Sequence, residues 1–425
     1  MIRHLFKLIW NRRRANALVI TEIFVCFLVL FAVVTLGIYS VLNYRSPLGF
    51  AYANVYSIDV DFEESRGDGS ASAASAPGAV AVPTPDNPYE ARQRALLQIV
   101  KADPSVEDAA WASPIPFSHS NEIRSDTVRK HTIRYSLAHT TDEYKNVMGI
   151  QITRGRWFSA EDDGAAYEPM VITEALARAA FGSEDPVGQS LTEDRPAKAA
   201  GEPHPEKERR VVGVMTAFRQ EGEMDINTET NASYALTRVE YPSGSMRRIG
   251  SIAARMKAGA NADVEARVAK SLLAAAPDWS FKITPLEMSA AFNRQVYTAP
   301  LVIAAVIAGF LILMVALGLS GVLWQSVTTR TREIGVRRAL GASAADVRWQ
   351  VIGELLVMAT IAMMVGVIVV LQFPFLDLLG PIPRSVFFAG LSLTIVALYA
   401  LALACGLQPA RLATTVQPAE ALRYE

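Results

Sequence analysis

The sequence predicts a membrane protein with four transmembrane α-helices and a large α+β extracytoplasmic domain between the first and second helices. Three observations lead to this fold class. The chain contains four long uncharged apolar runs, a polar stretch over 44–295, and alternating strand and helix patterns within that stretch. Hydrophobic residues make up 51% of the 425 residues and charged ones 20%, which is typical of a membrane protein with a substantial soluble part. The net charge of −1 gives no indication of nucleic-acid binding.

The four apolar runs are long enough to cross a bilayer. They are Ile23–Val41, Leu301–Trp324, Leu355–Leu371 and Ser385–Leu407, with 19, 24, 17 and 23 residues. A helix needs about 20 residues to cross the hydrocarbon core, and the shortest run can be extended at either end. We therefore predict transmembrane helices at 17–43, 296–325, 344–373 and 385–407. The first run is long for a signal-peptide core and no convincing A-x-A site follows it, so we expect an uncleaved span.

The basic residues predict the orientation. Residues 1–16 hold five Lys and Arg and no acid, 325–350 hold five arginines, and 372–384 hold only Arg384 as a basic residue. Lys and Arg near span ends are retained in the cytoplasm. Both termini and the segment 326–343 are therefore predicted inside, and 44–295 outside. We interpret 1–16 as an amphipathic helix on the inner membrane face, with a plain basic flank as the alternative, and 408–425 as a cytoplasmic tail.

The stretch 44–295 contains both strand and helix patterns. Val55–Phe62 alternates apolar and polar residues and predicts a strand. Further strands are predicted at 106–112, 170–173, 210–216, 251–256 and 279–284, and helices at 87–100, 174–181 and 262–276. Ser65–Pro88 and Glu193–Glu208 are predicted surface loops. We interpret Asp162 and Asp163 as part of a solvated acidic turn.

Arg330–Gly341, RTREIGVRRALG, is the most specific stretch of the chain. Glu333 precedes Arg337 by four residues, the favourable order on a helix. Gly341 suits the position after a helix end, and Ser343 with Asp346 matches a capping box. These features predict a short helix, a tight turn, and a second helix that enters the membrane. On physical grounds alone, a positive-inside loop of any multi-span protein remains the alternative.

The sequence gives no sign of a catalytic or cofactor site. It contains no G-x-x-x-x-G-K-[ST] phosphate loop, so we expect that the chain binds no ATP itself. Its histidines, among them His119, His131, His139 and His204, lack metal-type spacing, and no serine sits in a nucleophile-elbow motif. Cys26 and Cys405 fall inside apolar runs, which excludes a disulfide framework. The uncharged spans argue against a polar conduit and fit a bundle that transmits motion.

The segment REIGVRRALGAS, followed by Glu354, closely resembles the coupling helix of MacB/FtsX-type ABC transporter permeases. The pieces GRWFSAEDD, VITEALARAAFGSEDPVGQSL and VVGVM, in this order, resemble the extracytoplasmic core domain of MacB-type permeases. The tail, with PAR followed by PAEALRYE, resembles their cytoplasmic end. The resemblance covers nearly the whole chain.

The resemblance implies an organisation for the external domain and a docking role for the hairpin. It implies a porter-like part at 44–118 and 248–295 and a sabre-like insertion at 119–247. It also implies that the coupling helix, within 326–343, docks on a nucleotide-binding subunit. The residues expected to carry this contact are Arg330, Arg332, Glu333, Ile334, Gly335, Arg337, Arg338 and Gly341.

The resemblance further implies a non-catalytic permease in the bacterial inner membrane, working in efflux or extrusion from the periplasmic side. MacB proper carries its ATPase on the same chain, so this sequence implies a separate ATPase subunit that binds ATP and Mg. The other expected partners are a second permease copy or homologue, membrane lipids and a periplasmic adaptor protein. The alternatives are a lipoprotein-releasing complex subunit and a regulator of a periplasmic hydrolase or signalling partner. A membrane-anchored enzyme is the weakest alternative, because no catalytic site is visible.

Overall fold

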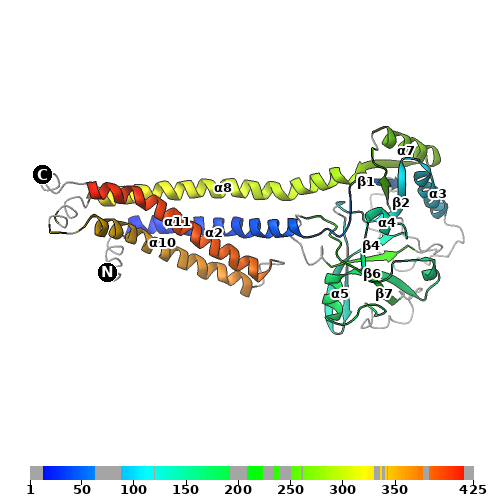
Figure 1. The fold of residues 1–425 in the computed structure, drawn as a ribbon, viewed down its shortest axis with the longest axis horizontal. Coiled ribbons are helices and arrows are strands. Elements are labelled where there is room, and N and C mark those ends of the chain that lie inside the picture. The colour runs from blue at the N-terminus through cyan, green and yellow to red at the C-terminus, as the bar shows by residue number, and fades with distance from the viewer. Residues whose placement is uncertain are drawn as a thin grey trace, which may run out of the picture. The chain divides into compact units, whose positions relative to one another are not determined.

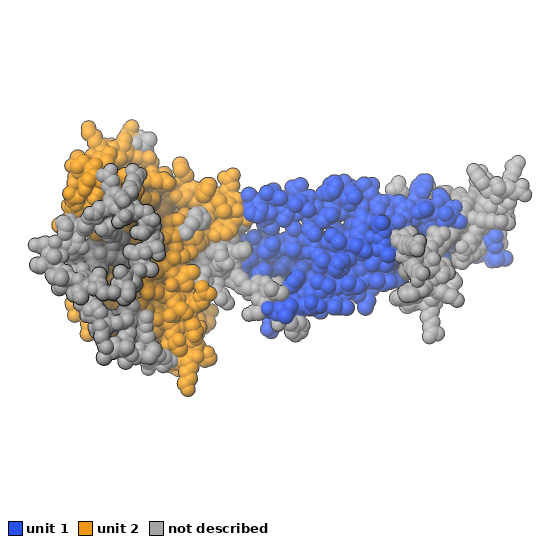
Figure 2. Space-filling view, turned by 180° about the vertical axis from the view of Figure 1, so that it is seen from behind, with its two compact units in different colours: residues 1–42, 298–425 blue, residues 43–297 orange. Residues whose placement is uncertain are grey.

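A computed structural model describes residues 13–62, 88–118, 120–191, 208–223, 233–239, 250–259, 262–329, 336, 340–341, 343–376 and 382–415. The chain divides into two compact units (Figure 2). The helical unit comprises 1–42 and 298–425, and the soluble unit comprises 43–297. Most of the predicted amphipathic helix at 1–16 and of the predicted loops at 65–88 and 193–208 lies outside the described residues. Of the described part, Arg13 begins a helix, Pro88 begins a helix and Glu208 begins a strand.

Four long helices supply the transmembrane part of the fold (Figure 1). They are α2 (Arg13–Arg45), α8 (Leu286–Thr329), α10 (Ala344–Phe375) and α11 (Arg384–Thr415). Each contains a stretch long and apolar enough to cross a membrane, which confirms the four transmembrane helices of the predicted fold class. α8 is one continuous helix of 44 residues whose first turns belong to the soluble unit.

The helical unit has its own apolar core. Phe27, Ala362 and Phe387 are fully buried in it. The rings of Phe31 and Phe387 meet edge to face at 5.3 Å, a favoured aromatic geometry. The hydroxyls of Thr360 and Tyr399 lie 2.9 Å apart and join α10 to α11, which satisfies two polar groups within an apolar bundle.

One half of the soluble unit is an antiparallel sheet with two helices. The strands run in the order β10 (Trp279–Pro285), β1 (Val55–Phe62), β9 (Ser251–Met256) and β2 (Val106–Ser113). The helices α3 (Pro88–Ala102) and α7 (Ala262–Ala275) pack on these strands. The core between them holds the buried side chains of Ile58, Leu96, Trp111 and Leu272.

The other half is a mixed sheet. Its strands are β3 (Glu122–Val128), β4 (His131–Thr140), β5 (Ile152–Gly155), β6 (Tyr167–Thr173), β7 (Glu208–Met215) and β8 (Tyr234–Arg238). β4 pairs with β8 and β6 with β7 in parallel, and the other pairs are antiparallel. The helix α5 (Glu174–Phe181) covers this sheet, and Thr173 Oγ1 caps it by accepting from the Leu176 amide at 3.3 Å.

The two halves meet where β2 pairs with β4, through Ala112–Thr140 and Ser113–His139. A third core lies across this junction and is built from aromatic side chains, including Phe50, Phe117, Phe218 and Tyr234. The short helix α4 (Tyr144–Met148) contributes the buried Tyr144 to the same core. The soluble unit therefore has one continuous strand order rather than two separate sheets.

Several predicted elements match the structure, and four of the described strands were not predicted. β1, α5 and β9 have the predicted bounds. The strands that were not predicted are β3, β4, β5 and β8. EIRSDTV in β3 buries an aspartate, and ITRG in β5 and YALTR in β8 are too short to show alternation. The division into porter-like and sabre-like parts at 119 and 247 stays a prediction.

Candidate functional site

The hairpin between α8 and α10 is the candidate coupling site. Seven of its expected residues lie outside the described part of the chain: Arg330, Arg332, Glu333, Ile334, Gly335, Arg337 and Arg338. The described residues define the C-terminal end of the hairpin. The Leu340 amide donates to the Val336 carbonyl at 3.0 Å, which is a helical i to i−4 bond, and the Leu340 side chain is 83% exposed. Gly341 has φ +100°, the positive φ that the sequence predicted.

A capping box starts the helix that follows the turn. Ser343 Oγ accepts from the Asp346 amide at 3.2 Å. Asp346 Oδ2 in turn accepts from the Ser343 amide at 3.1 Å and from Ser343 Oγ at 2.6 Å. These bonds confirm the predicted box, and they satisfy amides at a helix end that would otherwise have no partner.

The base of the hairpin is packed. Val327 near the end of α8 and Val347 in the first turns of α10 are buried against each other, with Val351 beside them. α8 and α10 are therefore in contact on both sides of the turn-bearing segment. A force applied to the hairpin would act on two packed helix ends rather than on a free loop.

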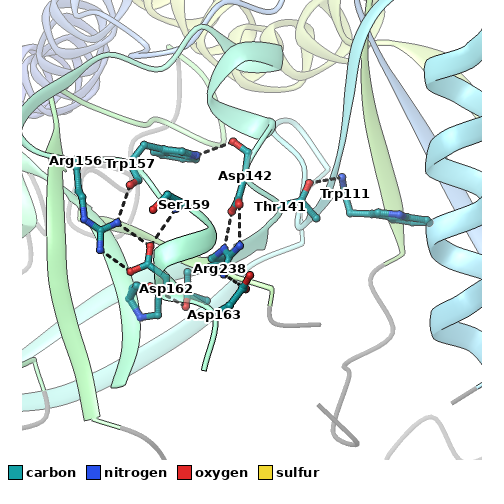
Figure 3. Close-up of polar contacts among 11 residues, drawn as sticks. Trp111, Thr141, Asp142, Arg156, Trp157, Ser159, Asp162, Asp163 and Arg238 are labelled. Carbon is teal, nitrogen blue, oxygen red and sulfur yellow. Dashed lines mark hydrogen bonds and ion pairs between the residues drawn. The ribbon is translucent and has the colours of Figure 1, made fainter. Parts of the chain in front are cut away.

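A polar network at the junction of the soluble unit involves residues from five separate segments (Figure 3). Arg238 of β8 binds Asp142 in bidentate fashion, with Nε–Oδ1 at 2.7 Å and Nη2–Oδ2 at 2.8 Å, and binds Asp163 at 2.5 Å. The hydrogen bonds that Arg238 donates to the Asp142 carboxylate raise the pKa of its guanidinium above its ordinary value. Trp157 Nε1 donates to the Asp142 carbonyl at 2.7 Å. Planar bidentate pairs of this kind fix orientation as well as charge.

A second bidentate pair lies beside it and corrects one prediction. Arg156 donates to both carboxylate oxygens of Asp162, at 2.7 and 2.6 Å, and the Asp162 side chain is fully buried. The interpretation of Asp162 as part of a solvated turn was therefore wrong, although Asp163 is 56% exposed. Sequence alone could not show that the short 3-10 helix η2 (Ala160–Asp162) turns one acid inward. Burial raises the pKa of Asp162, but hydrogen bonds from Arg156 and the Ser159 amide outweigh it and lower the pKa.

A third charged group lies inside the mixed sheet. Arg209 Nη1 donates to Asp126 Oδ2 at 3.0 Å, and both side chains are only 6% exposed. The Tyr135 hydroxyl donates to the same carboxylate at 2.5 Å, and burial raises the pKa of that tyrosine. Because each member is paired, we interpret this cluster as structural rather than catalytic.

The described residues offer no metal-type cluster of three or more His, Cys, Asp or Glu. His139 lies 3.4 Å from Glu122, while His119 and His204 lie outside the described residues.

The model of the MacB-like periplasmic core domain matches residues 20–271, and that of the FtsX-like permease C-terminal region matches residues 305–418. The macrolide export ATP-binding/permease protein MacB of Marinobacter nauticus is 24% identical over 78% of this chain and 52% of its own length. The uncharacterized ABC transporter permease YknZ of Bacillus subtilis is 24% identical over 67% of this chain and 68% of its own length.

The chain spans between a third and about half of the lengths of the first MacB relatives that it matches. Among solved structures, the periplasmic region of MacB from Actinobacillus actinomycetemcomitans is similar, with a TM-score of 0.36 and 15% identity. That match covers 58% of this chain and 93% of the solved one.

Proposed function

The chain belongs to the family of MacB/FtsX-type ABC transporter permeases, multi-pass proteins of the bacterial inner membrane, and we propose that it is a non-catalytic permease driven by a separate ATPase subunit. ATP and Mg would be bound by that partner. Relatives named as permeases, such as YknZ, support this arrangement.

The observation that carries the proposal is the course of α8. This helix begins at Leu286 in the soluble unit and continues without interruption to Thr329, where the basic hairpin starts. At about 1.5 Å per residue, a helix of this length reaches across a bilayer and beyond it. The hairpin then returns through the Gly341 turn and the Ser343 cap into α10. A displacement of the hairpin by an ATPase would therefore pass directly into α8 and α10.

We further propose that the work on substrate is extrusion from the periplasmic side. The MacB relatives are named as macrolide exporters, and their core domain matches the soluble unit of this chain. A second permease copy or homologue would complete the transporter, and a periplasmic adaptor would receive the substrate.

The test of the proposal is charge reversal on the hairpin. The double variant Arg337→Glu/Arg338→Glu should weaken co-purification with the partner ATPase, and should reduce the stimulation of its ATP hydrolysis by roughly fivefold to tenfold. A double change is needed because exposed ion pairs contribute only about 0–1 kcal/mol each. Arg348→Glu, an exposed arginine within α10, is the matched control and should have little effect. Undiminished binding and stimulation in the double variant would refute docking through this helix.

A further inference from the structure

One loop of the soluble unit contacts both of the segments that lead to the membrane. This loop, residues 217–223, follows β7 and is called here the Arg219 loop. It touches the chain that leaves α2 at 43–49, the beginning of α8 at 286–297, and the aromatic core at the sheet junction. All of these residues belong to the soluble unit.

On the α2 side, the loop holds the chain through Arg219, which is 6% exposed. Arg219 Nη1 donates to the Asn43 carbonyl at 2.8 Å, and the Arg219 amide donates to the Leu48 carbonyl at 3.0 Å. Gly49 has φ +85°, and a Cβ there would overlap the backbone of Ala217. The two backbones are therefore in direct contact, with a buried guanidinium bridging them.

On the α8 side, the loop is held through Asn293, which is 2% exposed. Asn293 Nδ2 donates to the Glu221 carbonyl, and Gly222, with φ +89°, packs against Phe117 and Asn293. Arg294 Nη2 lies 3.6 Å from Glu223 Oε2. The Arg294 guanidinium also lies 5.8 Å from the ring centre of Tyr44, in the segment that leaves α2.

On the sheet side, Gln220 and Phe218 anchor the loop. The Gln220 carbonyl accepts from the Phe117 amide at 2.9 Å, and its side chain accepts from the Tyr234 hydroxyl at 2.6 Å. The Phe218 ring lies 4.9 Å from Phe50 and 4.7 Å from Tyr234, centre to centre. Phe218 and Gln220 thus join the loop to the sheet, Arg219 holds the segment that leaves α2, and 221–223 contact the beginning of α8.

We propose that the Arg219 loop locks the end of α2 and the beginning of α8 to each other and to the sheet, so that neither segment moves alone. Arg219 and Asn293 are positioning residues in this scheme, because they act through backbone carbonyls and not on a substrate. Buried hydrogen bonds that form a closed network are stiff, since breaking one leaves a polar group without a partner. The role in transport rests on the proposed function, whereas the mechanical link itself does not.

The mechanical link can be tested on the full chain in detergent by hydrogen–deuterium exchange. Arg219→Met should raise amide exchange by about tenfold both at 43–49 and at 291–297, because one hydrogen-bonded loop holds both segments. Arg219→Lys should restore part of the protection. Arg255→Met is the matched control, since Arg255 makes the same kind of bonds to the carbonyls of Val147, Ala51 and Ala53. It should raise exchange at 51–54 and leave 291–297 unchanged.

Asn293→Ala tests the link from the α8 side, and it replaces Arg219→Met as the test if that variant fails to fold. Exchange should then rise at 43–49, although Asn293 lies in α8. If either variant raises exchange only in the segment that it directly contacts, the locking role is overturned. Both exchange measurements can be made without an ATPase. With the ATPase present, Arg219→Met should also lose stimulation of ATP hydrolysis. Coupled exchange with unchanged stimulation would leave the link intact and refute the proposed transmission of motion.

Discussion

Phe27 of α2 packs its ring directly against the backbone of α10 at Gly366, where a Cβ would overlap the ring. The same relationship occurs twice more in the helical unit. Thr35 of α2 fills the space beside Gly390 of α11, and Glu22 lies against Gly318 of α8. α2 therefore contacts each of the other three long helices at a glycine. Small residues at such contacts let helices approach closely within a membrane.

Gly366→Ala should destabilise the helical unit by about 1–3 kcal/mol, because the buried Phe27 ring must move to make room. The control is Gly321→Ala in α8, where an added Cβ meets nothing within 4 Å. That change should be neutral or stabilising by up to about 1 kcal/mol, since alanine is the better helix former. Unfolding midpoints in detergent would measure both effects, and equal midpoints for the two variants would contradict this packing.

Arg209→Met should be among the most damaging single changes in the soluble unit. It leaves the buried Asp126 carboxylate without its cation, and breaking a buried ion pair from one side costs about 3–5 kcal/mol. Arg134→Met on the exposed face of β4 is the control and should change stability by about 0.5 kcal/mol or less. Denaturant unfolding followed by tryptophan fluorescence would measure the difference. Similar midpoints for the two variants would refute a role for Arg209 in holding the sheet.

The Arg156–Asp162 pair should make stability depend on pH in the acid range. The folded pKa of Asp162 lies below the ordinary value of 3.8, so its contribution is fully present above that value. It is lost as the pH falls through the lower, folded pKa. Asp162→Asn should therefore be less stable than wild type near neutral pH, and the gap should narrow toward about pH 2.

Thermal unfolding across this pH range would measure the gap. Asp163→Asn is the comparison, since the Asp163 carboxylate is 56% exposed and its pairing with Arg238 is screened by solvent. A gap for Asp162→Asn that stays constant from neutral to acid pH would show that the pair is not the cause.

The proposed motion of the periplasmic domain can be followed with a spin label. Ser120 is exposed in the soluble unit, and the native Cys26 and Cys405 would first be replaced. In a complex of two permease copies with the ATPase, a label at Ser120→Cys should report different inter-copy distances in the nucleotide-free and ATP-trapped states. An unchanged distance distribution in a complex that hydrolyses ATP would reject the transmission of motion.

The membrane part of this fold could be predicted because its signals are local. A run such as Leu301–Trp324 carries its own evidence of a span in its length and lack of charge. Gly341 and Ser343 are similar cases, because a positive φ and a helix cap depend on neighbouring residues, and the structure has both. The strand β1 could be predicted from its alternating apolar and polar residues. The structure has both β1 and β9 at their predicted bounds.

Contacts between distant segments were decided only by the tertiary structure. The burial of the Asp162 side chain was also decided by the folded structure, although its partner Arg156 precedes it by only six residues. Arg219 and Asn43 are separated by most of the soluble unit, and Asp126 and Arg209 lie on different strands. The sequence by itself determined the number of candidate spans and the local ends of helices, because hydrophobicity and capping act over a few residues. The side of the membrane for each segment stays a prediction from the basic residues. The tertiary structure decided which buried charges are paired and which loop holds α2 and α8, because those energies exist only once the chain has brought remote groups together.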